Sequence, residues 1–203
     1  MPRTSKQTEQ IIQDAVASFP VFATHLWHYL RLPSPTPVQY QVADYLQEGP
    51  SRRIIMAYRG CGKSFLTAGY VLWRLRRDPD CKVLVISAAQ DRADAFSVFC
   101  HDLLRNWFMV KDLFPSDTQR FSKVAFDVYG AKPDQSPSVR SSGIFGQITG
   151  SRADLIVADD VETPQSCETQ LIRDKLRESI KEFDSVIKPG GEIVFLGTPH
   201  TQD

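Results

Sequence analysis

The chain has 203 residues, of which 42% are hydrophobic and 24% are charged, and its 24 basic and 24 acidic side chains give a net charge of zero. These proportions are typical of a folded globular protein and argue against a disordered chain. The balance of charge argues against a free-standing nucleic-acid binder that relies on a strong overall field, although it allows a local basic patch.

The sequence also indicates the cellular compartment and argues against some kinds of site. No apolar run approaches the roughly 18 residues of a membrane-spanning helix, and the N-terminus lacks the apolar core of a signal peptide. We therefore expect a cytosolic protein without a membrane partner, and its length favours one domain. The cysteines are far apart and form no C-x-x-C pair, which argues against a zinc site or a disulfide framework. They are Cys61, Cys81, Cys100 and Cys167.

The N-terminal part of the chain is predicted to be helical. Apolar residues at helical spacing indicate two short helices between residues 5 and 31, with a break at Pro20. A proline-rich connector leads to Pro37, where a third helix over 38–48 can begin. We interpret residues 1–36 as a helical segment packed on a core of residues 37–203.

Residues 54–64 carry the strongest signal, an apolar run followed by a glycine-rich turn. A loop that wraps phosphate needs small residues so that backbone N–H groups point inward, a lysine for the outer phosphates and a hydroxyl for magnesium. The pattern G-x-x-x-x-G-K-[ST] is missed only at its first position, where Ala57 stands. We expect this loop to bind a nucleotide. The expected binding residues are Arg59, Gly60, Cys61, Gly62, Lys63, Ser64 and Phe65.

Gln39 lies ahead of this loop and is a candidate for reading adenine, because a carboxamide can both donate to and accept from the edge of the base. An ordinary exposed helix glutamine is the equal alternative, and spacing alone does not decide between them.

The rest of the chain alternates between helical and extended patterns. The pattern predicts, in order, a helix after Ser64, a strand over 82–87, a helix over 89–108, a strand near 124–129, a strand or hairpin over 139–148, a strand over 153–158, a helix over 168–187, a turn at 189–191 and a strand over 192–197. The helix after Ser64 ends in Arg74, Arg76 and Arg77, which we interpret as a solvated helix end rather than a DNA contact. This alternation predicts an α/β fold with a mostly parallel central sheet and helices on both faces.

A carboxylate cluster follows the strand over 153–158. Ligands bind at the carboxyl ends of the strands in such sheets, so the phosphate loop, this cluster and Gly197-Thr198-Pro199 should meet at one edge. Asp159 fits the role of holding magnesium together with Ser64. Either Asp160 or Glu162 could polarise an attacking water, and the sequence leaves the choice open.

Together these segments resemble the N-terminal ATPase domain of phage large terminase subunits, in particular those of T7-like phages. The likeness rests on Arg59-Gly-Cys-Gly-Lys63-Ser64, on the acid-ending segment over 150–162 as a Walker B motif, and on 196–199 as a coupling motif. Gln39 with Pro37 resembles the family's adenine-reading segment. Asp160 stands where the family usually has glutamate, which leaves the catalytic carboxylate open between Asp160 and Glu162.

The resemblance implies an ASCE-type P-loop ATPase, RecA-like in fold, that hydrolyses ATP with magnesium to drive double-stranded DNA into a procapsid in the host cytoplasm. It implies a portal protein, a small terminase subunit and self-association into a ring, expected to be pentameric, as partners. Family members carry a C-terminal nuclease domain, and this chain ends at Asp203 without that domain's acidic metal cluster, so no nuclease activity is expected of it.

In such rings a neighbour's arginine completes the charge around the transferred phosphate, and an arginine of this kind contributes about 10³–10⁵ in rate. The sequence favours Arg120 or Arg140, which lie in its least regular region, over Arg92 and Arg152. Arg59 is interpreted as a contact to phosphates within its own chain and, with Lys63, as part of the catalytic set.

Two other functions share these motifs. A superfamily 2 helicase-like, DNA-dependent ATPase would have the same glutamine, loop and acidic strand end, but it would need a second RecA-like half. A nucleotide-gated assembly module would bind ATP to order a ring and would hydrolyse it slowly alone.

Overall fold

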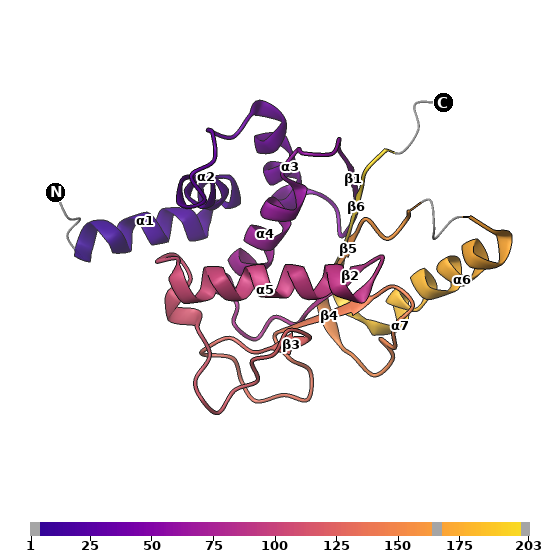
Figure 1. The fold of residues 1–203 in the computed structure, drawn as a ribbon. Helices are drawn as coiled ribbons and strands as arrows, with labels where there is room; N and C mark the ends of the chain where they lie inside the picture. The colour runs from indigo at the N-terminus through magenta and orange to yellow at the C-terminus, as the bar shows by residue number, and fades with distance from the viewer. Residues whose placement is uncertain (1–4, 164–167, 200–203) are drawn as a thin grey trace.

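A twisted sheet of six strands forms the centre of the molecule in a computed structural model that describes residues 5–163 and 168–199 (Figure 1). In chain order the elements are α1 (Ser5–Ala17), α2 (Phe19–Tyr29), α3 (Pro37–Glu48), β1 (Arg52–Met56), α4 (Lys63–Arg77), β2 (Val83–Ser87), α5 (Gln90–Asn106), the short 3₁₀ helix η1 (Lys111–Leu113), β3 (Ala125–Phe126), β4 (Val139–Gly143), β5 (Ala153–Asp159), α6 (Gln170–Lys181), α7 (Phe183–Val186) and β6 (Ile187–Gly197).

The strands follow the order β1-β6-β5-β2-β4-β3, and every neighbouring pair is parallel except β3 with β4. The last strand of the chain is therefore inserted between β1 and β5. Its register pairs Gly197 with Met56 on one side and Leu196 with Asp159 on the other. As a result, three segments that are distant in sequence end side by side at one edge of the sheet.

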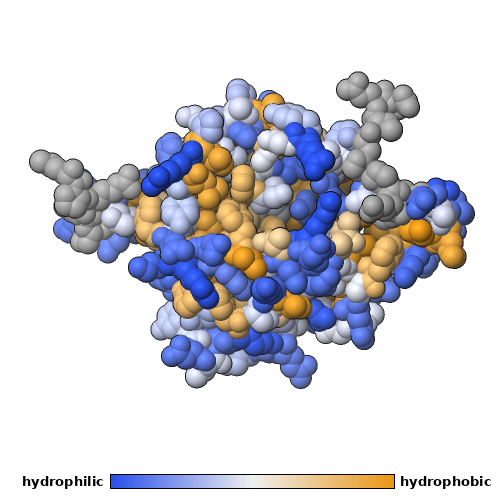
Figure 2. Space-filling model, in the orientation of Figure 1, coloured by the Kyte–Doolittle hydropathy of each residue, from blue (hydrophilic) through white to orange (hydrophobic). Residues whose placement is uncertain are grey.

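Helices cover both faces of the sheet, as the alternating pattern predicts. Helices α1 to α5 share one large core with residues of β2, β5 and β6, in which Trp73 of α4 and Phe19 of α2 are fully buried. The outward side of α5, at the front of the molecule in Figure 1, is covered mostly by hydrophilic residues (Figure 2). On the opposite face α6 and α7 pack on a smaller core that includes Leu176 and Phe183.

The helix boundaries near the N-terminus follow proline chemistry. The break between the first two helices lies at Ser18, and Pro20 stands in the first turn of α2, where its missing N–H has no helical partner to lose. The predicted break at Pro20 is therefore shifted by two residues. Helix α3 begins at Pro37 as expected, and Thr36 closes its N-terminus by accepting a hydrogen bond from the Gln39 backbone N–H.

Four predicted elements differ from the structure. The strand near 124–129 is reduced to Ala125–Phe126, and the segment near 139–148 is a strand only to Gly143, after which the chain turns. The helix over 168–187 is two helices that meet at Glu182. The turn at 189–191 lies inside β6, where the register against β5 shifts, and Gly190 has a φ of 78° there.

Within the described residues, no helix combines the length and the apolar character that crossing a bilayer requires.

Candidate active site

The glycine-rich loop spans the gap between the end of β1 and the start of α4. Gly60 and Gly62 adopt φ values of 89° and 81°, a left-handed conformation that costs glycine little and other residues more. Gly62 is the N-cap of α4, so the free N–H groups of the first helical turn begin at the loop. A helix N-terminus that emerges from a glycine loop favours a phosphate group on both hydrogen-bonding and dipole grounds.

Lys63 links the loop to the end of β6. Its Nζ donates hydrogen bonds to the carbonyl oxygen of Ala57 at 2.8 Å and to Oγ1 of Thr198 at 2.9 Å, and the lysine is almost fully buried. The Thr198 hydroxyl in turn donates to the carboxylate of Asp160, 3.0 Å from Oδ1 and 3.1 Å from Oδ2. The three side chains form a continuous polar chain from the phosphate loop to the acidic end of β5.

Asp160 holds a backbone conformation that is unusual for its residue type. Its φ is 45°, and its N–H donates to the carbonyl oxygen of Leu196 at 2.9 Å, one residue before the end of β6. A non-glycine residue in this region stores strain, and such strain occurs most often at functional sites. The contact with β6 therefore fixes Asp160 at the position from which it meets Thr198.

Asp159 lines a cavity of about 350 Å³ together with Ser64 and Arg92. The pKa of the Asp159 carboxyl is raised to about 6, mainly by burial and also by the neighbouring Asp160 charge, while Lys63 and Arg92 oppose the rise. The site therefore disfavours a negative charge on Asp159, and a bound cation would reverse that preference.

The residues beside the cavity fit a magnesium ion that is shared with a nucleotide. Ser64 and Asp159 offer the hard oxygen ligands that magnesium prefers. Among the described residues no group of three or more His, Cys, Asp or Glu side chains could hold a metal alone. Magnesium is commonly bound through one or two carboxylates plus substrate phosphates and water, which agrees with this sparse set.

Gln39 contacts the loop through its side chain. Its Nε2 donates to the carbonyl oxygen of Cys61 at 2.9 Å, and its Oε1 accepts from the Thr36 backbone N–H at 2.7 Å. Both ends of the carboxamide thus already have partners. Gln39 lies beside the phosphate loop, as the sequence suggests, but in this arrangement it braces the loop, and reading adenine would require it to exchange these bonds.

Trp27 also contacts the loop, although the sequence does not single it out. A Cβ atom on Gly62 would lie 3.1 Å from the Trp27 ring, and the ring also meets Phe65 edge-on at 6.3 Å between centroids. Trp27 therefore supports the loop from the α2 side. No pattern in the sequence marks it, because its role depends on how α2 packs against the start of α4.

Glu162 and Asp160 differ in position. Asp160 lines the cavity and joins the Lys63–Thr198 chain, whereas Glu162 is exposed and is not among the residues that line this cavity. Arg59 is exposed on the loop. Pro199 follows Thr198 directly and ends the described chain.

The arginines considered for a role in a neighbouring subunit fall into two groups. Arg120 pairs with Asp127 at 2.8 Å, and Arg140 donates to the Ser151 hydroxyl at 2.8 Å. Arg92 and Arg152 are exposed. Arg92 lines the cavity that also contains Asp159 in the same chain, and Arg152 directly precedes β5, at the edge of the sheet opposite this cavity. To serve a neighbour, Arg120 or Arg140 would have to break its bonds within the chain.

Comparison with known proteins places these features in context. No protein-family model matches the chain. Over 205 aligned residues it is 43% identical to the large terminase subunit of Enterobacteria phage T3, an alignment that covers all of this chain and 35% of that protein. The chain thus spans about a third of the length of that relative.

Two solved structures share the fold. The large terminase ATPase domain of Thermus phage P74-26 superposes with a TM-score of 0.54 at 17% identity, covering 87% of this chain and 69% of that one. A structure of S. cerevisiae dbp5 bound to gle1 and IP6 gives a TM-score of 0.58 at 13% identity, covering 93% of this chain and 47% of the matched chain. At these identities both likenesses concern the fold alone.

Proposed function

The chain belongs to the phage large terminase family along its whole length, and from this premise we propose that it is the ATPase motor region of a large terminase subunit. In this role it hydrolyses ATP with magnesium and couples hydrolysis to the movement of double-stranded DNA into a procapsid. Its partners would be DNA, a portal protein, a small terminase subunit and further copies of itself in a ring, in the host cytoplasm.

The hydrogen-bonded chain from Lys63 through Thr198 to Asp160 is the observation that carries this proposal. A nucleotide γ-phosphate beside the loop would accept the third N–H of the Lys63 ammonium, whose other two N–H groups are donated to Ala57 and Thr198. Thr198 would then connect the phosphate-bound Lys63 to the Asp160 carboxylate. The end of β6 thus reports whether the γ-phosphate is present.

The roles of the remaining residues follow from their positions. The backbone of Gly60 and Gly62 and the first turn of α4 would hold the phosphates, and Ser64 with Asp159 would hold magnesium. Magnesium, when bound, would neutralise charge that develops on the phosphates. Asp160 is better placed than Glu162 to orient a water toward them, since it lies in the cavity.

A measurement of magnesium-dependent phosphate release tests the proposed activity. Wild-type protein should hydrolyse ATP, and both Lys63→Ala and Asp159→Ala should abolish turnover, the former with loss of nucleotide binding. Asp160→Asn should lower turnover far more than Glu162→Gln, whereas equal and mild losses would sink both assignments of the water-orienting carboxylate. Binding of ATP without turnover, even with portal and procapsid present, would instead support a nucleotide-gated assembly module.

A response to DNA would distinguish a packaging motor from a general nucleotidase. We expect double-stranded DNA at low salt to change the ATPase rate or the sedimentation of the chain. If neither changes, the chain lacks the contact surface for DNA. The fold shared with dbp5 leaves a helicase-like ATPase open, and the identity of 43% to a terminase subunit over the whole chain favours the motor.

A further inference from the structure

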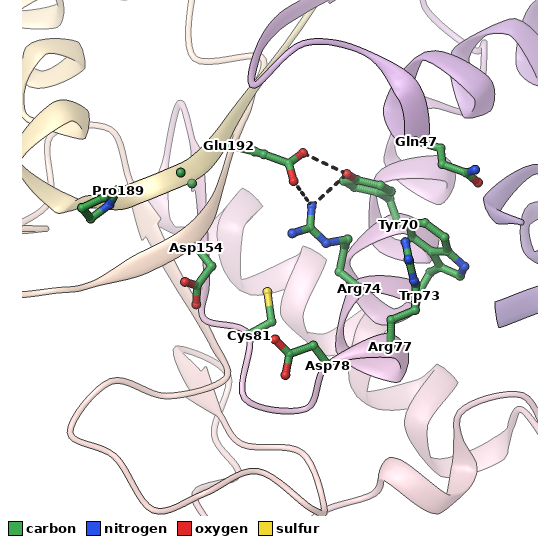
Figure 3. A pocket seen from close by; sticks show the side chains of 12 residues that line it. Gln47, Tyr70, Trp73, Arg74, Arg77, Asp78, Cys81, Asp154, Pro189 and Glu192 are labelled. Atoms are coloured by element: carbon green, nitrogen blue, oxygen red, sulfur yellow. Dashed lines mark hydrogen bonds and ion pairs between the residues drawn. The ribbon is translucent and has the colours of Figure 1, made fainter. Parts of the chain in front are cut away.

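A second polar cluster lies at the edge of the sheet opposite the candidate active site. It centres on Glu192 of β6, whose carboxylate accepts from Nη1 of Arg74 at 2.5 Å and from the Tyr70 hydroxyl at 3.3 Å. Arg74 also donates to the Tyr70 hydroxyl at 3.1 Å. Figure 3 shows these side chains joined along one wall of a cavity of about 480 Å³, with Asp154, Cys81 and Asp78 on its other side.

Arg53 of β1 extends the cluster to two more elements. Its guanidinium pairs with the Glu192 carboxylate and also donates to the carbonyl oxygens of Tyr45 and Leu46 in the last turn of α3. The Arg53 side chain is only 2% exposed, so this charge depends on its partners inside the protein. The Glu192 carboxylate thus connects β6 with α4 and β1 directly, and with α3 through Arg53.

The other ends of these four elements all contribute to the candidate active site. Helix α3 carries Gln39 near its start, β1 runs into the phosphate loop, α4 begins at Lys63, and β6 ends beside Thr198. The contacts at the two edges are therefore made by opposite ends of the same elements.

Helix α4 and strand β6 are joined by side chains at both ends. From Lys63 to Arg74 the helix rises about 16 Å, and from Glu192 to Thr198 the strand covers about 20 Å. At the near end Lys63 donates to Thr198, and at the far end Arg74 donates to Glu192. Regular helices and strands transmit a shift along their length, so the far contact constrains where the near one can form.

We propose that the Arg74–Glu192 ion pair is a positioning contact for the phosphate site, holding α4 and β6 in the register that brings Lys63 onto Thr198. This inference rests on the proposed ATPase function. The phosphate loop itself is made by β1 and α4, whereas Thr198 arrives on β6. Loss of the pair should therefore impair turnover and leave the binding of ATP nearly unchanged.

Arg74→Met is the sharpest variant, because it releases α4 while leaving the buried Arg53–Glu192 pair intact. Arg76→Met is the matched control, since Arg76 lies in the same last turn of α4 and pairs with Asp112, which is not on the sheet. With nucleotide binding measured by a fluorescent ATP analogue and turnover by phosphate release, Arg74→Met should lower kcat by about 10- to 100-fold, the range that small misplacements of reacting groups produce. Arg76→Met should stay within about twofold of wild type in kcat, because the Arg76–Asp112 pair joins α4 to η1 and not to the sheet.

A double-variant comparison separates positioning from general loss of stability. In a background of Thr198→Val, where the near contact is already gone, adding Arg74→Met should lower kcat little further, because both changes act through one contact. Tyr70→Phe, which keeps both charges, should cause a smaller loss in the same direction. Full multiplication of the two losses, or an equal loss in Arg76→Met, would overturn the proposal. Absence of turnover in wild type would contradict the proposed function instead.

Discussion

At the scale of single residues, the candidate active site combines several features that are energetically unfavourable in the ligand-free chain and that a bound ligand would explain. Asp159 is held near another carboxylate in a partly closed cavity, Asp160 has a strained backbone, and Lys63 is buried. Each of these features costs folding free energy in the chain alone. A site that binds phosphates and a cation recovers that cost on binding.

Asp159 gives a pH-dependent stability that can be measured. Its carboxyl has a pKa of about 6 in the folded chain and regains an ordinary value near 4 on unfolding. The folded state therefore binds more protons between these values, and stability falls as the pH rises through that interval. With magnesium chelated, Asp159→Asn should raise the free energy of unfolding at pH 7.5 by about 1 to 3 kcal/mol.

Chemical denaturation at a series of pH values checks this prediction. The gain should shrink as the pH is lowered and vanish below the unfolded pKa, at about pH 3, where the wild-type carboxyl is protonated in both states. Asp117→Asn, at an exposed position, should produce no pH-dependent gain. A gain from Asp159→Asn that is equal at all pH values would contradict the assignment of the raised pKa.

The loop glycines offer a second residue-scale test with a built-in control. Gly62→Ala and Gly60→Ala both force a side chain into a left-handed backbone, which costs about 1 to 2 kcal/mol. At Gly62 the new Cβ also meets the Trp27 ring at 3.1 Å, whereas at Gly60 no atom lies within 4 Å. Gly62→Ala should therefore destabilise the ligand-free chain by about 1 kcal/mol more, in the range of overpacking. Equal losses in denaturation would show that Trp27 does not support the loop.

The sequence predicts those residues of the candidate site whose chemistry depends on their neighbours along the chain. A lysine and a serine after a glycine turn, or two aspartates after a buried strand, predict their surroundings from their neighbours along the chain. The contact between Lys63 and Thr198 joins residues 135 positions apart, and it exists because β6 is inserted beside β1. That insertion carries no local signal, so the hydrogen-bonded chain could not be predicted atom by atom.

At the scale of elements, the irregular region before β4 is organised by Arg120. Besides Asp127, its guanidinium donates to the carbonyl oxygens of Asp134 and Gln135, each at 2.7 Å. This arginine therefore substitutes for regular backbone pairing in a segment that the sequence left unreadable. Strand β3 is short for the same reason: side chains there satisfy backbone groups in place of a partner strand. The alternation over 124–129 could not reveal this substitution.

Arg120→Ala should loosen this segment without affecting the phosphate site. Amide hydrogen exchange should rise for residues 127–138, because the carbonyl groups lose their donor and the segment opens more often. Nucleotide affinity should remain that of wild type, and Arg152→Ala, which removes an exposed arginine, should leave the exchange unchanged. If Arg120 instead serves a neighbouring subunit, the variant would lose turnover in the assembled ring while exchange in the segment stays the same.

At the scale of the whole molecule, the fold class follows from alternation alone. The mostly parallel sheet with two covered faces is as predicted. Helices α1 and α2, interpreted as a segment packed on the core of residues 37–203, share one continuous hydrophobic cluster with α4, and Trp73 Nε1 donates to the carbonyl oxygen of Ala15 at 3.1 Å. We therefore propose that the N-terminal helices are a permanent support of the loop, which Trp27 reaches from α2.

The whole molecule also explains why a motor would be built in this way. The proposed γ-phosphate site takes one segment each from the ends of β1, β5 and β6, and β6 extends to the ionic cluster at the far edge. On this proposal, a change at Thr198 would alter both the position of Asp160 and the contacts of β6 at the opposite edge. This arrangement suits a protein in which the state of the nucleotide must be sensed elsewhere in the assembly.

The central claim is that Thr198 connects the phosphate-binding lysine to Asp160. The most direct test is the kcat for ATP of Thr198→Val, measured beside the dissociation constant for an ATP analogue. We expect the affinity of Thr198→Val for the ATP analogue to stay close to wild type. Its kcat for ATP should fall by about 100-fold, as when a positioned group in proton transfer is lost. A Thr198→Val protein that hydrolyses ATP at the wild-type rate would contradict the central claim.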